Sequence, residues 1–421
     1  EVCLCGCCDD RPQILGEVVL MPLYVPSPIF RNPDGSVSTN GAALTARQFR
    51  PTSMVYDMPI LRAKLLDVLS NASDCIIGFY GDARLAGVAA GSGGNSDWND
   101  SARYTPPALI GRLLADSGYP VCRDGWFGVR GQGAASIPAA DPQNTMTGTW
   151  VTVNASGETL GKGAQRASVS GSTWTYQPDA PWDTCDIWVQ QMSGGTGACT
   201  ASATGATSVA MGFSAASYQL TKYTLTKSAV DLAPLVLTAG TAFSNYNGVI
   251  AFTFRNSAKK QILIRNHAIG GAIMADHVVA TRPYSSLNAY QATGLAPDVL
   301  FVEMLTNSIN GSESLASWLA NWDTFLAAMD TASRDMLVYI GAPCSQTWAT
   351  DGTLDAWIAA LKPKLDARGI NLFDLRGIYG QSWAAGNALG YWYSSDALTK
   401  RGLGAYAAKV AKDLLSVVAP W

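Results

Sequence analysis

Two ionisable side chains directly follow an apolar segment that has the pattern of a buried strand. The segment covers residues 75–80, and Asp82 and Arg84 come after it. The guanidinium of Arg84 is suited to clamp a carboxylate or sugar hydroxyls, and a solvent-facing position is the alternative. The carboxylate of Asp82 is suited to accept backbone N–H bonds where the strand ends, which we favour over a catalytic role. Between them lies Ala83, which offers no nucleophile.

Imidazole side chains, the most common general bases, are scarce in this sequence. His267 and His277 are the two histidines. His277 is predicted near the start of a helix, where we favour a solvated or capped side chain over one that swings toward the end of the strand. Near the C-terminus, Asp396 and Thr399 lead into an amphipathic stretch. The hydroxyl of Thr399 cannot accept a proton near neutral pH.

Nine cysteines are distributed unevenly along the chain. Cys3, Cys5, Cys7 and Cys8 crowd the N-terminus, where we favour disulfides within the segment or to a neighbouring subunit. A metal site and unpaired thiols are the alternatives, but no second distant pair follows, as zinc ribbons usually require. Cys75 lies in the first apolar segment and is predicted to act as a small buried hydrophobe. We therefore expect neither a metal nor a cofactor.

The composition restricts the classes of function. Hydrophobic residues make up 48% of the 421-residue chain and charged residues only 14%, so much of the surface consists of small polar residues that suit glycan contact or lateral packing in an assembly. The net charge is −3, the pI is near 5.5 and no basic cluster occurs, which argues against nucleic-acid binding. No apolar run reaches the roughly 18 residues of a membrane-spanning helix. We expect a soluble protein with no nucleic-acid or membrane partner.

The pattern of apolar and polar residues changes along the chain. Residues 1–55 have no helical periodicity and are predicted to form an extended, Cys-rich arm. Residues 56–125 and 256–421 alternate strand-like apolar runs with amphipathic helical stretches. Residues 126–255 alternate apolar and polar positions in short runs between turn residues, which is typical of an antiparallel β-sandwich or jelly roll. The sequence thus predicts an α/β domain that an inserted β-domain interrupts.

Strands that alternate with helices of this length predict a doubly wound parallel sheet with helices on both faces. Such sheets bind ligands at the carboxyl ends of their strands. The predicted helices are 57–69, 106–117, one from Gly271, 313–329, 354–366 and one that ends near Val418. The predicted strands are 75–80, 261–266, 299–304, 336–341 and 370–375.

Four short motifs at the predicted strand ends resemble, in order and placement, those of the SGNH (GDSL-like) esterases. The first motif is Gly-Asp-Ser in that family and Gly-Asp-Ala at residues 81–83 here. The resemblance therefore makes Ala83 the nucleophile position. The last motif is Asp-x-x-His, and here Asp396, Thr399 and Gly404 keep its frame. Asp396 takes the position of the orienting carboxylate and Thr399 that of the base.

The two middle motifs supply oxyanion donors in the SGNH esterases. In the second motif, Gly271 takes the position of the amide donor and Ala268 replaces the first Gly. In the third motif, Asn307 keeps the side-chain amide, and Leu305 and Ser308 replace its flanking residues. The resemblance makes Gly271 and Asn307 the candidate oxyanion donors.

The resemblance covers about residues 57–118 and 256–418 and implies a three-layer, flavodoxin-like α/β fold. A serine esterase needs a hydroxyl that an imidazole activates, and losing the pair costs on the order of 10⁶ in kcat. Ala83 and Thr399 therefore predict a catalytically inactive relative. The alternatives are a carbohydrate O-acetylesterase captured as a Ser-to-Ala mutant, an esterase with an unusual base such as His277, and a pure assembly module that binds no ligand.

The inserted segment resembles the β-sandwich found within esterases of bacteriophage tail fibres and tailspikes, on the basis of residues 182–189 and the turn at Gly194 and Gly195. This resemblance implies a structural or glycan-binding component of a virus particle, located in the virion or outside cells. The partners it implies are a glycan or O-acetylated polysaccharide, other virion subunits reached through the N-terminal arm, and further copies of the chain in a homo-oligomer.

Overall fold

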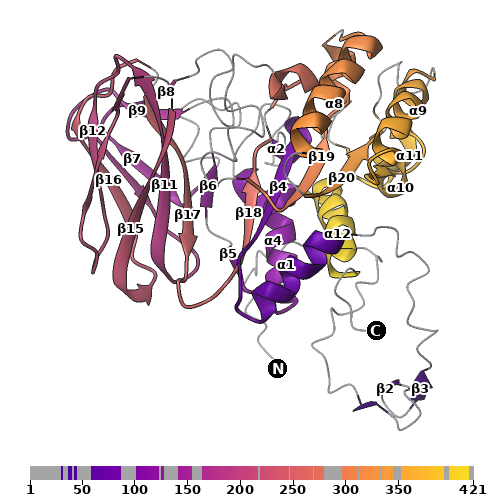
Figure 1. Ribbon diagram of the computed structural model, residues 1–421, viewed down its shortest axis with the longest axis horizontal. Helices are drawn as coiled ribbons and strands as arrows, with labels where there is room; N and C mark the ends of the chain where they lie inside the picture. Colours follow the sequence, from indigo (N-terminus) through magenta and orange to yellow (C-terminus); the bar gives the residue numbers. More distant parts are fainter. Residues whose placement is uncertain are drawn as a thin grey trace, which may run out of the picture. The chain divides into compact units, whose positions relative to one another are not determined.

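The computed structural model divides the chain into two compact units, Glu1–Phe49 and Arg50–Trp421 (Figure 1). Among the residues it describes, no helix combines the length and hydropathy that a bilayer crossing requires. The described residues are 30–31, 37–39, 42–44, 58–86, 101–122, 125–127, 141–153, 164–216, 219–245, 247–268, 270–278, 296–311, 313–330, 334–342, 344, 352–392 and 398–416.

The described part of the first unit is a small antiparallel sheet. Its strands are β1 (Phe30–Arg31), β2 (Val37–Thr39) and β3 (Ala42–Leu44), with β2 in the middle. The prediction of an extended arm did not include these strands. The four N-terminal cysteines, on which the disulfide and metal alternatives depend, lie outside the described residues.

A six-stranded parallel sheet forms the centre of the α/β part of the second unit. The strand order is β21-β20-β19-β4-β18-β5, and each described pairing is parallel. This sheet confirms the predicted α/β class. The strands are β4 (Cys75–Gly81), β5 (Val121–Cys122), β18 (Ile262–Asn266), β19 (Val299–Glu303), β20 (Asp335–Ile340) and β21 (Asn371–Asp374).

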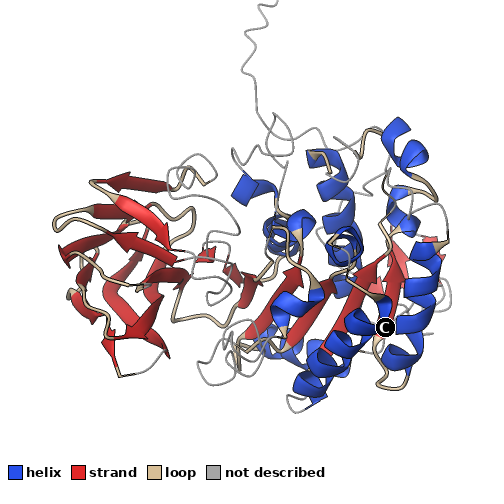
Figure 2. Ribbon diagram, turned by 90° about the horizontal axis from the view of Figure 1, so that it is seen from above, coloured by secondary structure: helices blue, strands red, loops and turns tan. Residues whose placement is uncertain are grey.

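Helices cover both faces of this sheet (Figure 2). On one face, α1 (Pro59–Leu69), α4 (Pro106–Asp116) and α12 (Lys400–Ser416) share a core with the sheet residues Phe79 and Phe301. The opposite face packs against α8 (Leu315–Asp330) and α9 (Thr353–Asp366). The short helices are α2 (Ala83–Ala86), α3 (Ser101–Tyr104), η3 (Met274–His277), α7 (Thr306–Asn310), α10 (Arg376–Tyr379) and α11 (Trp383–Ala388).

The segment between β5 and β18 folds into two further sheets. One has the order β13-β12-β16-β10-β7; the other has the order β14-β11-β17-β9-β8, with β15 on β11 and β6 on β17. No described residue from 125 to 255 is helical, and a jelly-roll topology stays a prediction. The strands are β6 (Gly125–Phe127), β7 (Asn144–Thr147), β8 (Trp150–Val153), β9 (Ala164–Ala167), β10 (Thr173–Tyr176), β11 (Trp182–Ser193), β12 (Ala198–Ser202), β13 (Val209–Gly212), β14 (Ser214–Ala215), β15 (Gln219–Asp231), β16 (Leu235–Thr241) and β17 (Gly248–Arg255).

The segment leaves the parallel sheet and returns to it at neighbouring positions. Cys122 in β5 is paired with Leu263 in β18, and the amide of Ile262 donates to the carbonyl of Pro120 at 2.8 Å. The two ends therefore lie side by side, as an insertion requires. The exact domain boundaries stay a prediction.

One predicted helix is wrong. The helix expected from Gly271 is instead a turn followed by the four-residue 3₁₀ helix η3. Gly271 has φ +80°, a left-handed conformation that ends regular structure rather than starting it. The other predicted helices and strands of the α/β part are present, with bounds that differ by one or two residues.

Candidate functional site

The candidate site lies where the three central strands of the parallel sheet end. β4 lies between β18 and β19. Gly81 at the end of β4 is paired with Glu303, and Phe79 is paired with Asn266. Strand β18 pairs with one edge of β4, and the later strand β19 pairs with the other edge, so the order in which strands are added changes direction at β4. Doubly wound sheets bind ligands at the point where the strand order changes direction.

Asp82 shapes the turn from β4 into α2. Its carboxylate is 2% exposed and accepts a hydrogen bond from the amide of Arg84 at 3.0 Å. The carbonyl of Asp82 accepts a second bond from the amide of Ala86 at 3.0 Å. These bonds satisfy amides of the first turn of α2. Ala83, the predicted nucleophile position, is the first residue of α2 and has no hydroxyl.

The guanidinium of Arg84 joins three segments at this edge. Arg84 is 5% exposed, so the solvent-facing alternative is wrong. Its Nε donates to Oε1 of Glu303 at 2.5 Å, and Nη2 lies 3.4 Å from Oδ2 of Asp82. Nη2 also donates to the hydroxyl of Thr306 in α7. Arg84 therefore clamps carboxylates of the protein itself and ties the end of β4 to β19 and α7.

Glu303 carries the most unusual acid–base property of this cluster. Burial raises the pKa of Glu303 to about 7; the charge of Arg84 opposes this rise and that of Asp82 adds to it. Sequence reasoning gave no role to Glu303 or Thr306. A signal was present, since Glu303 is a charged residue that ends an otherwise apolar strand, and buried carboxylates need a partner.

Asn307 in α7 presents an amide donor without an acceptor. Its Nδ2 is buried and has no hydrogen-bond partner in the described part of the chain. The next residue, Ser308, is 1% exposed, and its hydroxyl accepts a bond from the amide of Met274 at 3.1 Å. Ser308, which departs from the family motif, therefore fastens α7 to η3. Gly271, the other predicted oxyanion donor, is exposed.

The second motif is fastened to α2 by side-chain hydrogen bonds. Nδ2 of Asn266 donates to the carbonyl of Leu85 at 2.9 Å, and its Oδ1 accepts from the amide of Ala268 at 3.1 Å. A Cβ at Gly81 would lie 2.9 Å from the backbone carbonyl oxygen of Glu303 and 2.5 Å from a methyl group of Leu85, so glycine allows β4, β19 and α2 to approach this closely. The structure thus links the segments that contain Ala83, Gly271 and Asn307.

Thr399 serves as a helix cap. Its hydroxyl donates to the carbonyl of Gly390 at 2.7 Å and accepts from the amide of Gly402 at 3.1 Å. The second bond satisfies an amide in the first turn of α12. Asp396, the predicted orienting carboxylate, lies outside the described residues.

Both histidines are buried beside Tyr80. His277 is 2% exposed, and burial lowers its pKa to about 4 although Asp276 opposes this. His267 is 1% exposed, and burial, Arg265 and His277 lower its pKa. The rings of His267 and His277 lie 4.7 and 6.0 Å from that of Tyr80, between ring centroids. The predicted solvated position of His277 is wrong, and both imidazoles are neutral at pH 7.

Within the described ranges, no group of three or more His, Cys, Asp or Glu side chains is arranged to hold a metal ion. Burial raises the pKa of the Cys75 thiol, which is fully buried in β4. The cysteines of the described residues are all buried, and they are Cys75, Cys122, Cys185, Cys199 and Cys344.

Comparisons with known proteins support the fold. No family model matches the sequence, and no curated protein matches it. Among solved structures, the chain is similar to a peptidoglycan O-acetylesterase at 16% identity, covering 85% of this chain and 96% of that chain with a TM-score of 0.60. A family two carbohydrate esterase from Cellvibrio japonicus aligns at 11% identity over 66% of this chain and 96% of that chain, with a TM-score of only 0.28. The chain therefore shares the overall fold of that peptidoglycan O-acetylesterase.

Proposed function

We propose that the protein binds an acylated glycan at the carboxyl edge of its parallel sheet and does not hydrolyse it. The observation that carries this proposal is the position of Thr399. Where the esterases have an imidazole, the Thr399 hydroxyl is committed to capping α12. Ala83 has no hydroxyl, so neither half of the nucleophile–base pair is available at these positions.

Two donors that the motifs assign to the ligand support this proposal. Nδ2 of Asn307 lacks an acceptor among the described residues. A buried donor without an acceptor costs about 1–3 kcal/mol, which a ligand oxygen would recover. Gly271 is exposed on the neighbouring segment. The fold similarity to a peptidoglycan O-acetylesterase supports an acetylated sugar as the ligand class.

Hydrolysis of a carbohydrate O-acetyl group is the second candidate function, and the same fold similarity favours it. It requires a Ser in place of Ala83, as in an enzyme captured as a Ser-to-Ala mutant, or a nucleophile elsewhere, and in either case a base other than Thr399. His277 is the first suspect for the base, but its burial and its pKa of about 4 make it a weak one at neutral pH.

Turnover of 4-nitrophenyl acetate by four proteins tests the proposal: the unmodified chain, Ala83→Ser, Thr399→His and the double variant. We expect the unmodified chain and both single variants to remain at background, because a Ser hydroxyl without an imidazole stays protonated. The double variant should exceed either single change. Activity in the unmodified chain would refute the proposal, and full activity in Ala83→Ser alone would favour the second candidate.

Binding of an O-acetylated oligosaccharide by the unmodified chain separates ligand binding from a pure assembly role. We expect calorimetry to detect binding by the unmodified chain. Asn307→Ala should raise the Kd at least about tenfold, because the variant loses a hydrogen bond between two uncharged groups. The matched control is Asn387→Ala, an exposed residue of α11. Absence of binding by the unmodified chain would favour the assembly module.

The finer proposal is that the protein is a tail-fibre or spike component of a virus particle. Its support is the resemblance of the inserted segment to phage esterases. It assigns attachment to virion subunits to residues 1–55 and includes self-association. Sedimentation of the full chain and of a chain without residues 1–55 tests this assignment. We expect a homo-oligomer that depends on the arm, and a monomeric full chain would contradict it.

A further inference from the structure

A buried arginine next to Asn266 takes no part in the hydrogen bonds of the candidate site, and the strongest opposite charge acting on it comes from the inserted segment. Arg265 in β18 is 4% exposed. Its guanidinium forms no hydrogen bond or ion pair with any described residue, and its Nε and Nη1 are buried. Arginines this buried are almost always paired, so Arg265 requires an explanation.

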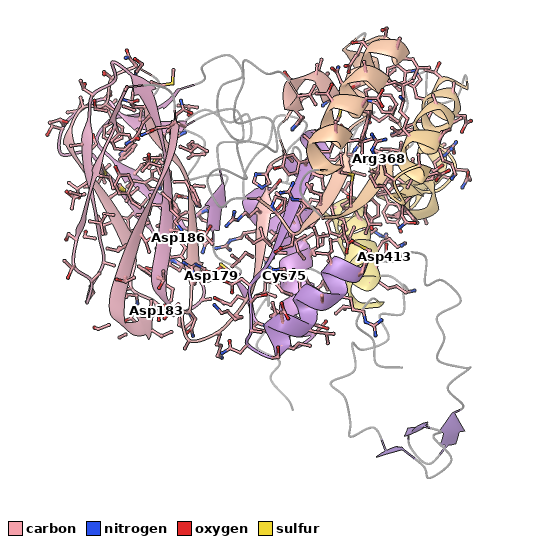
Figure 3. All side chains as sticks on the ribbon, in the orientation of Figure 1. Cys75, Asp179, Asp183, Asp186, Arg368 and Asp413 are labelled. Atoms are coloured by element: carbon pink, nitrogen blue, oxygen red, sulfur yellow. The ribbon has the colours of Figure 1, made fainter. Side chains whose placement is uncertain are left out.

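The carboxylate whose charge acts most strongly on Arg265 already has other partners. Asp186 in β11 attracts the Arg265 charge, but its Oδ2 lies 2.9 Å from Nη2 of Arg255 and its Oδ1 accepts from the hydroxyl of Thr224 at 2.8 Å. Figure 3 labels Asp186 on the inserted segment. Asp186 therefore forms an ion pair with Arg255 and none with Arg265, which leaves one positive charge in excess.

The other titratable neighbours of Arg265 do not supply a negative charge. They are Cys122 in β5, Tyr80 in β4 and the imidazole of His267. Thiols and phenols ordinarily lose their proton well above pH 7 and an imidazole is neutral or positive, so none of the three supplies a negative charge. We call the group Tyr80, Cys122, Asp186, Arg255 and Arg265 the arginine seam.

An unpaired charge in this seam is energetically unfavourable. Removing a guanidinium from water costs several kcal/mol unless hydrogen bonds and an opposite charge replace the lost hydration. Burial lowers the pKa of Arg265, but only to about 10, so the group is charged at neutral pH. A singly charged anion would neutralise the seam and accept the free N–H groups.

We propose that the arginine seam binds one small, singly charged anion on the guanidinium of Arg265. The ligand class is chloride or the carboxylate of a small acid. The bound anion neutralises the excess charge that Arg265 of β18 and Arg255 of the inserted segment place together, so it stabilises the attachment of the inserted segment to the parallel sheet. This inference uses residues separate from Ala83, Asn307 and the glycan site, and it does not depend on the proposed function.

Thermal unfolding of the full chain at constant ionic strength tests the proposal. The background salt is sodium gluconate, whose anion is too large for a buried seam, and chloride or acetate replaces it up to about 0.2 M. Because an anion that binds only the folded state stabilises it, we expect the unfolding midpoint to rise by about 2 °C or more. The two replacements show whether the seam takes a halide, a carboxylate or both.

Arg265→Met is the decisive variant. In gluconate it should unfold at the same temperature as the unmodified chain or higher, because the substitution removes an unpaired buried charge. It should show no response to chloride or acetate, whereas Arg265→Lys should keep a weaker one. Arg368→Met, at an exposed arginine just after α9 (Figure 3), is the matched control and should respond like the unmodified chain.

Three results would overturn the proposal. They are an unmodified chain whose midpoint is the same in all three salts, an Arg265→Met variant that responds normally, and an Arg265→Met variant that is strongly destabilised in gluconate. The last result would mean that the chain itself pairs the guanidinium. Crystals soaked in bromide give an independent readout, with an anomalous peak expected beside Arg265.

Discussion

At the scale of residues, Glu303 and Arg84 form a buried salt bridge. Both are at most 5% exposed, and Asp82 adds a second carboxylate. Two carboxylates beside one guanidinium leave one negative charge in excess. Burial and the charge of Asp82 raise the pKa of Glu303 to about 7, so this side chain takes up a proton as the pH falls below that value and the excess negative charge is removed.

This raised pKa predicts a pH-dependent contribution to stability. The folded state binds the Glu303 proton more tightly than the unfolded state, so the contribution is complete below about pH 4.5 and is lost as pH rises to about 7. The loss is on the order of 3 kcal/mol. Urea unfolding from pH 5 to pH 8 should show Glu303→Gln gaining stability relative to the unmodified chain, and a constant difference would contradict the assignment.

His277 should show the opposite sign. Burial lowers its pKa from 6.5 to about 4, so its contribution is present above pH 6.5 and is lost as pH falls toward 4. In the same urea series, His277→Gln should therefore gain stability relative to the unmodified chain as pH falls from 7 to 5. If both variants followed the same trend, the changes in stability would not come from these two side chains.

The residues of the site were predictable to different degrees. Motif order placed Ala83 directly after β4 and Asn307 shortly after β19, and the structure has both residues there. The roles assigned to Ala83, Asn307 and Thr399 stay predictions, and motif order rests on the rule that ligands bind at the strand ends of a parallel sheet. It did not identify Glu303, whose importance depends on a partner 219 residues away in sequence. Pairing between distant segments leaves no local periodicity, so sequence patterns predict it poorly.

At the scale of elements, α12 depends on the cap that Thr399 supplies. Thr399→Ala removes the acceptor of the Gly402 amide and should lower the free energy of unfolding by about 1 kcal/mol, while Thr399→Asn should keep most of it. Urea unfolding measures the difference. The control is Thr324→Ala in α8, whose hydroxyl bonds only the carbonyl of Ala320 one turn back. An equal loss in both alanine variants would show that the Thr399 cap has no special role.

Helices in which apolar residues recur at regular spacing were predicted well, whereas the segment after β18 was not. In α8, apolar residues recur every three or four positions, and Trp318, Trp322 and Phe325 are buried as that period requires. The segment after Gly271 has a similar composition, but its backbone is set by the left-handed glycine and by the bond from Met274 to Ser308. A tertiary hydrogen bond overrides local propensity there.

At the scale of the whole second unit, the inserted segment shares a core with the α/β part. Trp188 in β11 and Ile250 in β17 belong to the same buried cluster as Tyr80 and Met274. The sequence held a sign of this, because the apolar run 187–189 does not alternate, and strands buried on both faces lack alternation. Which surface covers the second face could not be predicted, since it depends on how two distant segments pack.

This shared core predicts that the inserted segment and the parallel sheet unfold together. Calorimetry of the full chain should show one transition for residues 50–421, with equal calorimetric and van't Hoff enthalpies. Trp188→Ala should lower stability by about 3–5 kcal/mol and split the transition in two, because it opens a cavity in the core that joins the parts. Trp174→Ala, in the core of the inserted segment alone, should destabilise that segment first. Two separate transitions in the unmodified chain would mean that the contact through Trp188 is too weak to couple the two parts.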